Sequence, residues 1–445
     1  MRYHDSMSDS FLVLCAQNRA RFIGALGEDA ALFFGAPHRS RNSDSEFRYR
    51  QHSDVLYLSG WTQPEVALLF RPGHAEPFVM FVQPRDPATE QWAGRRPGPE
   101  GAVQDYGADA AFPYAQLAEK LPSLLQGYRT LHYRFAADPD HDRLVSGAIR
   151  KSRKQARYSS LDVPDAIIDP ARVLHELRLI KSAGELDILR RSAAITCEAH
   201  LASMAATAPG VYEYELEAII EGTFRRRGGT GPGYTSIVGG GANATILHYI
   251  ENNDVLQDGS LVCVDAGCEY SWYTTDVTRT WPVRGTFSGP QRDLYEVVLR
   301  AQLAAIDTNR LGGRFLDSHK AATRVLTEGM VALGLLEGDV DELIATGAQK
   351  RYYMHGTSHW LGLDVHDVGA YAGGGKSRPF MPGMVLTIEP GLYIAEGDQD
   401  APEAFRGIGI RIEDDILVTA GDPVVLTAAV PKSIDDVEAA VRGGR

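Results

Sequence analysis

The sequence predicts an α+β fold in which a smaller α/β domain at residues 1–172 precedes a larger α+β domain at residues 173–445. The chain has 445 residues, which is more than a single ordinary hydrophobic core accommodates. In the first part, short apolar runs alternate with polar breaks, as expected of strands joined by turns and helices. In the second part, helix and strand patterns do not alternate one for one, which favours α+β over a doubly wound sheet.

The first domain is predicted from runs of four or five apolar residues. These runs predict strands at 30–34, 55–58, 66–70 and 78–82, and a helical pattern follows at 115–125. The Asp169-Pro170 pair then marks a break in the pattern, close to which we place the domain boundary.

The second domain opens with strong helix signals. Ser182 and Glu185 have the spacing of a capping box, and apolar residues then recur at helical spacing as far as Cys197. A second helix presents an apolar face from Leu216 to Phe224 and ends at a glycine pair. Further helices are predicted at 291–307 and 317–333, and strands at 260–267, 272–281, 385–388 and 408–418.

Composition excludes several partners and sites. The net charge of −13 gives no long-range attraction to nucleic acid or to an anionic membrane, although Arg85, Arg95 and Arg96 could form a local basic patch. The four cysteines form no CxxC pair and no disulfide framework. The N-terminal apolar run is too short for a signal peptide, and no stretch has the length of a membrane span. We therefore expect a cytoplasmic protein.

Two acidic residues on the predicted strands can be tested by geometry. If residues 260–267 and 272–281 form a hairpin that turns at Tyr270-Ser271, Asp265 and Asp276 lie directly opposite each other. Opposed residues share a face of the sheet, with Cβ atoms about 5 Å apart. Two carboxylates at that separation repel unless a cation lies between them. The alternative is a pair of solvated aspartates, but both residues have apolar neighbours.

Other residues extend this pair into a candidate site. Glu389 follows an apolar strand directly, and burying such a carboxylate without a partner is costly. Glu413 lies within a second apolar run, where Asp414 and Asp415 are expected to face solvent or to support the site. A segment rich in histidine contributes His359, with His355 and His366 on either side. Four carboxylates and an imidazole form a ligand set suited to a pair of hard divalent cations.

Competing motifs do not fit. The chain has neither HExxH nor GxSxG, and the glycines at 373–375 lack the spacing of a phosphate-binding loop.

The order of these motifs resembles that of a known family. VDAGCEY, TTDVTRT, MHGTSHWLGLDVHDVG, TIEPGLY and GIGIRIEDD resemble the motifs of the pita-bread metallopeptidases, over about residues 175–430. The segment NSDSEFRYRQHSDVLYLSGWTQPE is similar to the N-terminal domain of bacterial aminopeptidase P. The resemblance implies a C-terminal pita-bread domain that hydrolyses the bond between an N-terminal residue and a following proline.

The resemblance also implies roles for individual residues. Two divalent cations, with Mn²⁺ the preferred ion, would activate a water molecule. The implied metal ligands are Asp265, Asp276, His359, Glu389 and Glu413. Glu389 would also move protons, and His355, His366 and Arg411 would assist it, the histidines by contacting the substrate and Arg411 by orienting a carboxylate. The implied substrate-binding residues are His248, His355, His366, Tyr393 and Trp92.

Trp92 matches a position at which the N-terminal domain of a neighbouring subunit closes the site, which implies a homo-oligomer, a tetramer or a dimer. The expected partners are therefore peptides with proline at position two and other copies of the chain. Three alternatives stay open: a prolidase restricted to dipeptides, a metal-free relative acting as a binding protein, and a carbon–nitrogen hydrolase of small metabolites.

Overall fold

The structure is a computed structural model that describes residues 6–443. It divides into two compact units, Met1–Arg178 and Leu179–Arg445. The first unit is an α/β domain built on one sheet, and the second combines several small sheets with long helices. The predicted α+β fold is therefore confirmed.

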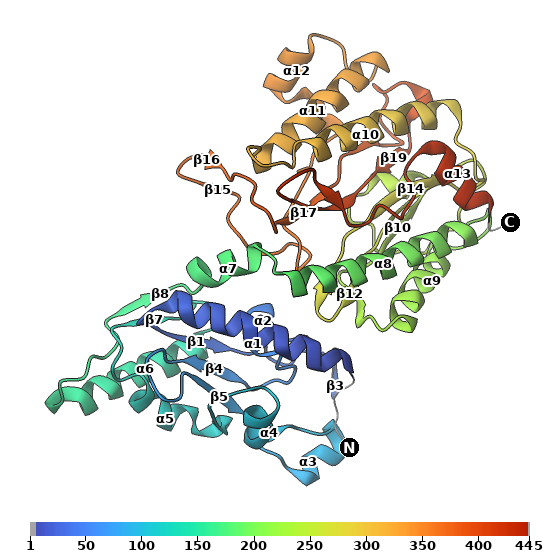
Figure 1. The fold of residues 1–445 in the computed structure, drawn as a ribbon. Helices are drawn as coiled ribbons and strands as arrows, with labels where there is room; N and C mark the ends of the chain where they lie inside the picture. The colour runs from blue at the N-terminus through green and yellow to red at the C-terminus, as the bar shows by residue number, and fades with distance from the viewer. Residues whose placement is uncertain (1–5, 444–445) are drawn as a thin grey trace. The chain divides into compact units, whose positions relative to one another are not determined.

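The N-terminal unit is built around a six-stranded sheet with the order β6-β5-β4-β1-β7-β8 (Figure 1). The strands are β1 (Ala30–Phe34), β4 (Ala67–Phe70), β5 (Phe78–Val82), β6 (Ala110–Pro113), β7 (Thr130–His132) and β8 (Ala166–Ile168). A separate hairpin pairs β2 (Ser40–Asn42) with β3 (Ser45–Glu46). The helices are α1 (Ser6–Leu26), α2 (Ser53–Ser59), α3 (Pro87–Ala93), α4 (Gly98–Gln104), α5 (Leu117–Leu124), α6 (Pro139–Gln155) and α7 (Ala171–Leu179).

Both faces of this sheet are covered by helices. Successive side chains of a strand point to opposite faces, and in β1 Leu32 packs into the cluster that contains Leu121 of α5 and Val145 of α6. Its neighbour Phe33 makes an edge-to-face contact with Phe22 of α1, at 5.6 Å between ring centroids. Burial on two faces explains why the central strands β1, β4 and β5 consist of uninterrupted apolar residues.

The strand predicted at 55–58 is wrong, because these residues belong to helix α2. Every residue from Val55 to Ser59 is buried, so the short run shows no polar face that would reveal helical spacing. The helix ends at Gly60, whose φ of 69° is a left-handed conformation that favours glycine.

In the C-terminal unit, the capping box predicted at Ser182 is confirmed and opens the longest helix of the described residues, α8 (Ala183–Ala206). Helices α8 and α9 lie on one side of the strands in Figure 1, and α10 and α11 lie on the other. The remaining helices of this unit are α9 (Glu213–Arg226), α10 (Gly289–Asp307), α11 (Phe315–Ala332), α12 (Val340–Thr346) and α13 (Ile434–Arg442).

The strands of this unit are short and form several small sheets. Three-stranded sheets have the orders β10-β11-β14, β13-β12-β9 and β17-β20-β21, and β18 pairs with β19 and β15 with β16. Their bounds are β9 (Gly231–Pro232), β10 (Ile237–Gly240), β11 (Leu261–Asp265), β12 (Cys268–Tyr270), β13 (Tyr273–Thr274), β14 (Thr278–Pro282), β15 (Ala372–Gly373), β16 (Lys376–Ser377), β17 (Val385–Ile388), β18 (Gly391–Ile394), β19 (Ile408–Arg411), β20 (Asp414–Leu417) and β21 (Val424–Val425).

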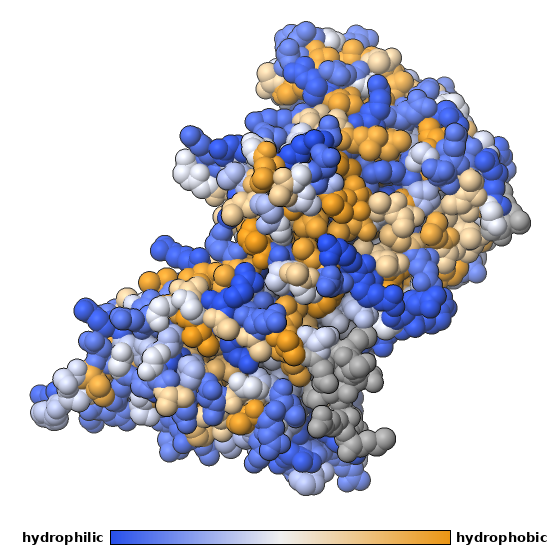
Figure 2. All heavy atoms as spheres, viewed as in Figure 1, coloured by the Kyte–Doolittle hydropathy of each residue, from blue (hydrophilic) through white to orange (hydrophobic). Residues whose placement is uncertain are grey.

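One hydrophobic core joins these sheets to the helices on both sides, with Trp281, Leu294 and Trp360 fully buried in it. On the face shown in Figure 2, hydrophobic side chains gather over the middle of the C-terminal unit, and polar ones cover much of the rest. Among residues 6–443, the structure contains no helix with the length and apolar character needed to cross a membrane.

Candidate metal centre

Asp265 and Asp276 are carried by a hairpin whose register differs from the predicted one. Asp265 ends β11 and pairs with Thr278 rather than with Asp276. The turn consists of Ser271 and Trp272, with φ values of 46° and 69°, and it lies between the paired residues Tyr270 and Tyr273. The predicted turn at Tyr270-Ser271 is therefore wrong. The register shifts by two residues, and a shift of two leaves each side chain on its original face.

The two aspartates still approach each other, as diagonal neighbours on one face of the hairpin. The hydroxyl of Tyr234 donates to Asp265 Oδ1 at 2.6 Å and also contacts Asp276 Oδ1. Asp265 is 9% exposed and Asp276 is 6% exposed. Solvated hairpin aspartates, the alternative reading of the sequence, are thus excluded by the burial of both side chains.

His359 and the two glutamates complete the cluster. His359 Nε2 lies 3.3 Å from Asp276 Oδ2 and 3.6 Å from Glu389 Oε1. Ligand atoms of Asp276, His359 and Glu413 all lie within 4.8 Å of one another. Asp265 joins this group through Tyr234, and Glu389 joins it through His359. The five predicted ligands therefore converge from four separate segments of the chain.

Strand ends and strand breaks place these side chains. Glu389 directly follows β17, and its N–H donates to the carbonyl of Thr357 at 2.9 Å. Glu413 lies in the gap between β19 and β20, where its N–H donates to the carbonyl of Thr278 at 3.0 Å. The hydroxyl of Thr278 in turn donates to Glu413 Oε2 at 2.6 Å. The continuous strand predicted at 408–418 is interrupted where it supplies the candidate ligand.

The electrostatics of the cluster favour a cation. Burial and the charge of Asp265 raise the pKa of Asp276, and burial with the charge of Asp276 raises that of Glu413. Burial likewise raises the pKa of Glu389 to about 7. Burial alone would lower the pKa of His359, but the carboxylate of Asp276 raises it to about 9. The site thus has more negative charge than its protein cations balance, and its oxygen-rich donor set fits hard divalent ions.

Arg411 is the main protein cation of this cluster. Its guanidinium donates from Nη2 to Asp265 Oδ2 at 2.7 Å, from Nε to Thr278 Oγ1 at 3.0 Å and from Nη1 to the Tyr393 hydroxyl at 3.1 Å. Burial alone would raise the pKa of Asp265, but the Arg411 charge and the Tyr234 hydroxyl hold it below its usual value. Arg411 is therefore positioned to fix the orientation of one candidate ligand.

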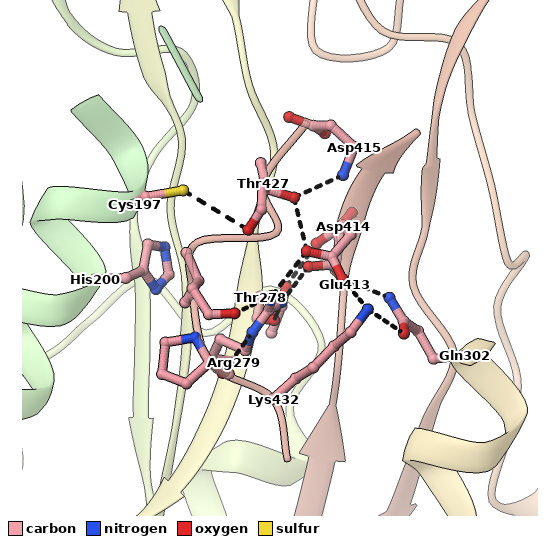
Figure 3. Close-up of polar contacts among 12 residues, drawn as sticks. Cys197, His200, Thr278, Arg279, Gln302, Glu413, Asp414, Asp415, Thr427 and Lys432 are labelled. Atoms are coloured by element: carbon pink, nitrogen blue, oxygen red, sulfur yellow. Dashed lines mark hydrogen bonds and ion pairs between the residues drawn. The ribbon is translucent and has the colours of Figure 1, made fainter. Parts of the chain in front are cut away.

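A second buried ion pair lies behind Glu413 (Figure 3). Arg279 Nη2 donates to Asp414 Oδ1 at 2.7 Å, and both side chains are fully buried. Lys432 Nζ and Gln302 Nε2 contact the other oxygen of Asp414 at 2.7 and 2.8 Å. Burial alone would raise the pKa of Asp414, but the charges of Arg279 and Lys432 hold it below its usual value. Arg279 Nη1 also contacts the carbonyl of Glu413, so the pair holds the backbone of a candidate ligand.

Asp414 and Asp415, expected to face solvent or to support the site, are both fully buried. Both carboxylate oxygens of Asp415 lie 3.3 Å from the backbone nitrogen of Asp276. Asp414 and Asp415 therefore support the site and do not face solvent. Their position next to Glu413 hinted at this role, whereas nothing in the sequence near Tyr234 marked it as the residue that joins the two aspartates.

Two candidate substrate residues lie against the cluster. His355 Nε2 is 2.9 Å from the Tyr393 hydroxyl, and His355 Nδ1 is 3.7 Å from Glu389 Oε2. Burial and the charge of Arg411 lower the pKa of His355 to about 4, so its ring is neutral near pH 7. His355 Nδ1 also lies 2.7 Å from the carbonyl of Gly356, which only accepts, so Nδ1 carries the proton and Nε2 accepts from the Tyr393 hydroxyl.

The remaining candidates occupy exposed positions. His366 packs edge-on against His359 with ring centroids 4.2 Å apart. His248 lies in an exposed segment. Burial lowers the pKa of His366, and the charges of His359 and His248 lower it further. Trp92 lies in α3 of the N-terminal unit with its side chain 90% exposed. The roles of these residues stay predictions.

The comparisons with known proteins agree with this geometry. Residues 187–420 match Metallopeptidase family M24, and residues 15–132 match Aminopeptidase P, N-terminal domain. The chain is 44% identical to the Xaa-Pro aminopeptidase of Escherichia coli over 94% of each chain.

Solved structures extend the similarity to three dimensions. The structure of Pseudomonas aeruginosa aminopeptidase PepP has a TM-score of 0.94 and 43% identity, covering 97% of this chain and 98% of that one. Zinc-substituted aminopeptidase P of E. coli in complex with product has a TM-score of 0.93 and 42% identity, covering 98% of this chain and 99% of that one. The chain therefore belongs to the aminopeptidase P group of metallopeptidase family M24, with its pita-bread catalytic domain.

Proposed function

We propose that the chain is an Xaa-Pro aminopeptidase, a metal-dependent hydrolase that releases the first residue of peptides with proline at position two. The observation that carries this proposal is the buried convergence of Asp276, His359 and Glu413, joined by Asp265 and Glu389, in a chain similar to aminopeptidases P over nearly its full length.

The residues that would hold the metal are Asp265, Asp276, His359, Glu389 and Glu413. Four carboxylates with two oxygens each and one imidazole nitrogen suit two divalent cations, and the mostly oxygen donor set suits Mn²⁺. Bound cations would lower the pKa of water and so supply a nucleophile near neutral pH.

Glu389 is proposed to move the proton. Its carboxylate lies within the cluster, 3.6 Å from His359 Nε2 and 3.7 Å from His355 Nδ1. Glu389 would accept a proton from the attacking water as the new carbon–oxygen bond forms. It would then deliver that proton to the proline nitrogen as the carbon–nitrogen bond breaks.

His355 and His366 are proposed to contact the substrate carbonyl and to stabilise the charge that develops on its oxygen. Arg411 would keep Asp265 oriented, and Tyr393 would hold the ring of His355. A proline nitrogen in a peptide carries no hydrogen, so its ring must be recognised by shape and apolar contact. His248, in the exposed segment beside these histidines, is proposed as part of that substrate pocket.

Three finer features also belong to this proposal. The exposed side chain of Trp92 supports a role in covering the site of a neighbouring copy, and therefore a homotetramer or homodimer. The N-terminal domain at residues 1–172 would then serve oligomerisation and substrate access. A cytoplasmic location is supported by four buried cysteines that all remain free thiols.

Peptide length tests this function against its nearest alternative. Purified protein is incubated with Arg-Pro-Pro and with an Xaa-Pro dipeptide, each with and without Mn²⁺. We expect Mn²⁺-dependent release of the first residue from the tripeptide. Cleavage of the dipeptide alone would indicate a prolidase. A protein that cleaves neither peptide and binds no metal would be a binding protein.

A further inference from the structure

Helix α8 presents a stripe of buried polar side chains to the hairpin that carries Asp265 and Asp276. Ser192, Thr196 and His200 follow one another at intervals of four residues, which places them on one face of the helix. All three are fully buried. Polar groups buried in a hydrophobic core are costly unless they form hydrogen bonds, so their partners identify what the stripe does.

The hydroxyl groups bond to the chain between the two aspartates. Ser192 Oγ donates to the carbonyl of Cys268 at 2.6 Å. The N–H of Cys268 donates to Thr196 Oγ1 at 3.0 Å, and Thr196 Oγ1 lies 2.7 Å from the hydroxyl of Thr275. Thr275 directly precedes Asp276, so each strand of the hairpin is bonded to the helix.

His200 bonds the residue that directly follows Asp265. Its Nε2 lies 3.0 Å from the carbonyl of Ala266, the residue after Asp265, and Figure 3 shows its ring projecting from α8 toward the strands. A carbonyl only accepts, so Nε2 carries the proton and Nδ1 is left as an acceptor. Nδ1 has no hydrogen-bond partner among the described residues. Burial lowers the pKa of His200 to about 4, which keeps the ring neutral.

The helix bonds the hairpin at the point where its regular strands stop. There the N–H of Ala266 donates to the carbonyl of Val277 at 3.1 Å, and the N–H of Thr275 donates to the carbonyl of Cys268 at 3.2 Å. Residues 266–267 and 275–277 belong to no strand, and they separate the β10-β11-β14 sheet from the β13-β12-β9 sheet. The two strands cross closely at this point, since a Cβ on Gly267 would lie 1.7 Å from the carbonyl oxygen of Thr275. Asp276 therefore lies between the two ladders, beside this close approach.

We propose that Ser192, Thr196 and His200 are positioning residues that set the separation of Asp265 and Asp276 for metal binding. This inference rests on the proposed function, in which both aspartates hold cations. The residues act through the backbone at Ala266 and Cys268 and through the side chain of Thr275, and they touch neither metal nor substrate.

Isosteric removal of one hydroxyl tests the proposal. Thr196→Val keeps the shape of the side chain and removes the acceptor of the Cys268 N–H. Loss of a group that orients metal ligands weakens metal binding by about 10- to 100-fold, and we expect a loss on the order of tenfold here. The readout is the Mn²⁺ dissociation constant of chelator-stripped protein, measured by calorimetry without peptide. Thr196→Ser restores the hydroxyl and should bind as the wild type does.

Thr327→Val is the matched control. Thr327 is also a fully buried helical threonine, but its hydroxyl bonds the carbonyl of Thr323 in its own helix, α11. We expect it to leave the Mn²⁺ dissociation constant unchanged. If Thr196→Val does not fold, Ser192→Ala replaces it in the same titration, with the same expected loss.

The outcomes separate this inference from the proposed function. If the stripped wild-type protein binds no Mn²⁺, the proposed function fails. If the wild type binds Mn²⁺ and the folded Thr196→Val or Ser192→Ala variant binds it equally well, only the positioning proposal is overturned. A loss that is the same in Thr327→Val as in Thr196→Val also overturns it, because the effect would then follow from any buried hydroxyl.

Discussion

Replacing Arg279 by methionine should destabilise the C-terminal unit strongly. Its guanidinium bonds Asp414 and three backbone carbonyls, those of Thr278, Val430 and Pro431, at 2.7–3.0 Å, and it also contacts the carbonyl of Glu413. Methionine fills part of the volume but donates no hydrogen bond.

The size of the effect follows from burial. Arg279 and Asp414 are both fully buried, so removing one partner leaves a charge that water cannot reach. Breaking a buried pair from one side typically costs about 3–5 kcal/mol. Lys432, Gln302 and Thr427 still contact Asp414 in the variant, which places the expected loss toward the lower end of that range.

Urea unfolding followed by tryptophan fluorescence measures this loss, because Trp281 and Trp360 are buried in the same unit. Arg284→Met is the matched control. Arg284 forms a bidentate pair with Asp258, but both side chains are more than half exposed, and such pairs contribute little. Equal unfolding midpoints for Arg279→Met and Arg284→Met would refute the reasoning.

Two further predictions concern protonation and metal binding. Burial alone would raise the pKa of Asp54, but the His175 hydrogen bond and the Arg178 charge hold it well below its usual value. Its contribution to stability is therefore present above about pH 4, the usual aspartate pKa, and is lost as the pH falls further. The melting temperatures of wild type and Asp54→Asn should differ at pH 7 and converge in acid; a constant difference would contradict this. Thr278→Val removes a hydroxyl that bonds both Glu413 and Arg411, and calorimetry should show Mn²⁺ affinity falling about 10- to 100-fold. Unchanged affinity would show that this hydroxyl does not orient the ligand.

Local patterns predicted much of the fold. The strands at 78–82 and 385–388 match β5 and β17 to the residue, because short runs rich in β-branched and aromatic residues are typical of buried strands. The residues of α2 form a similar run, yet they are helical. Burial on every side removes the polar face that distinguishes the two, so the sequence pattern alone could not resolve them.

The geometry of the site was harder to predict than its residue types. The break between β19 and β20 and the turn at Ser271 and Trp272 place Glu413 and Asp276. Neither feature carries a local signal in the sequence. The turn has positive φ values without the glycine or asparagine that usually marks such a turn. The support from Tyr234, Asp415 and helix α8 depends on contacts between distant segments, which no periodicity in the sequence reveals.

Metal-dependent turnover tests the central claim most directly. Stripped wild-type protein is titrated with Mn²⁺ while release of the first residue from Arg-Pro-Pro is followed, and Asp265→Ala is measured in parallel. The account predicts that activity rises with two bound Mn²⁺ per chain and that Asp265→Ala loses metal and activity together. Hydrolysis by the stripped protein, or full activity in Asp265→Ala, would contradict it.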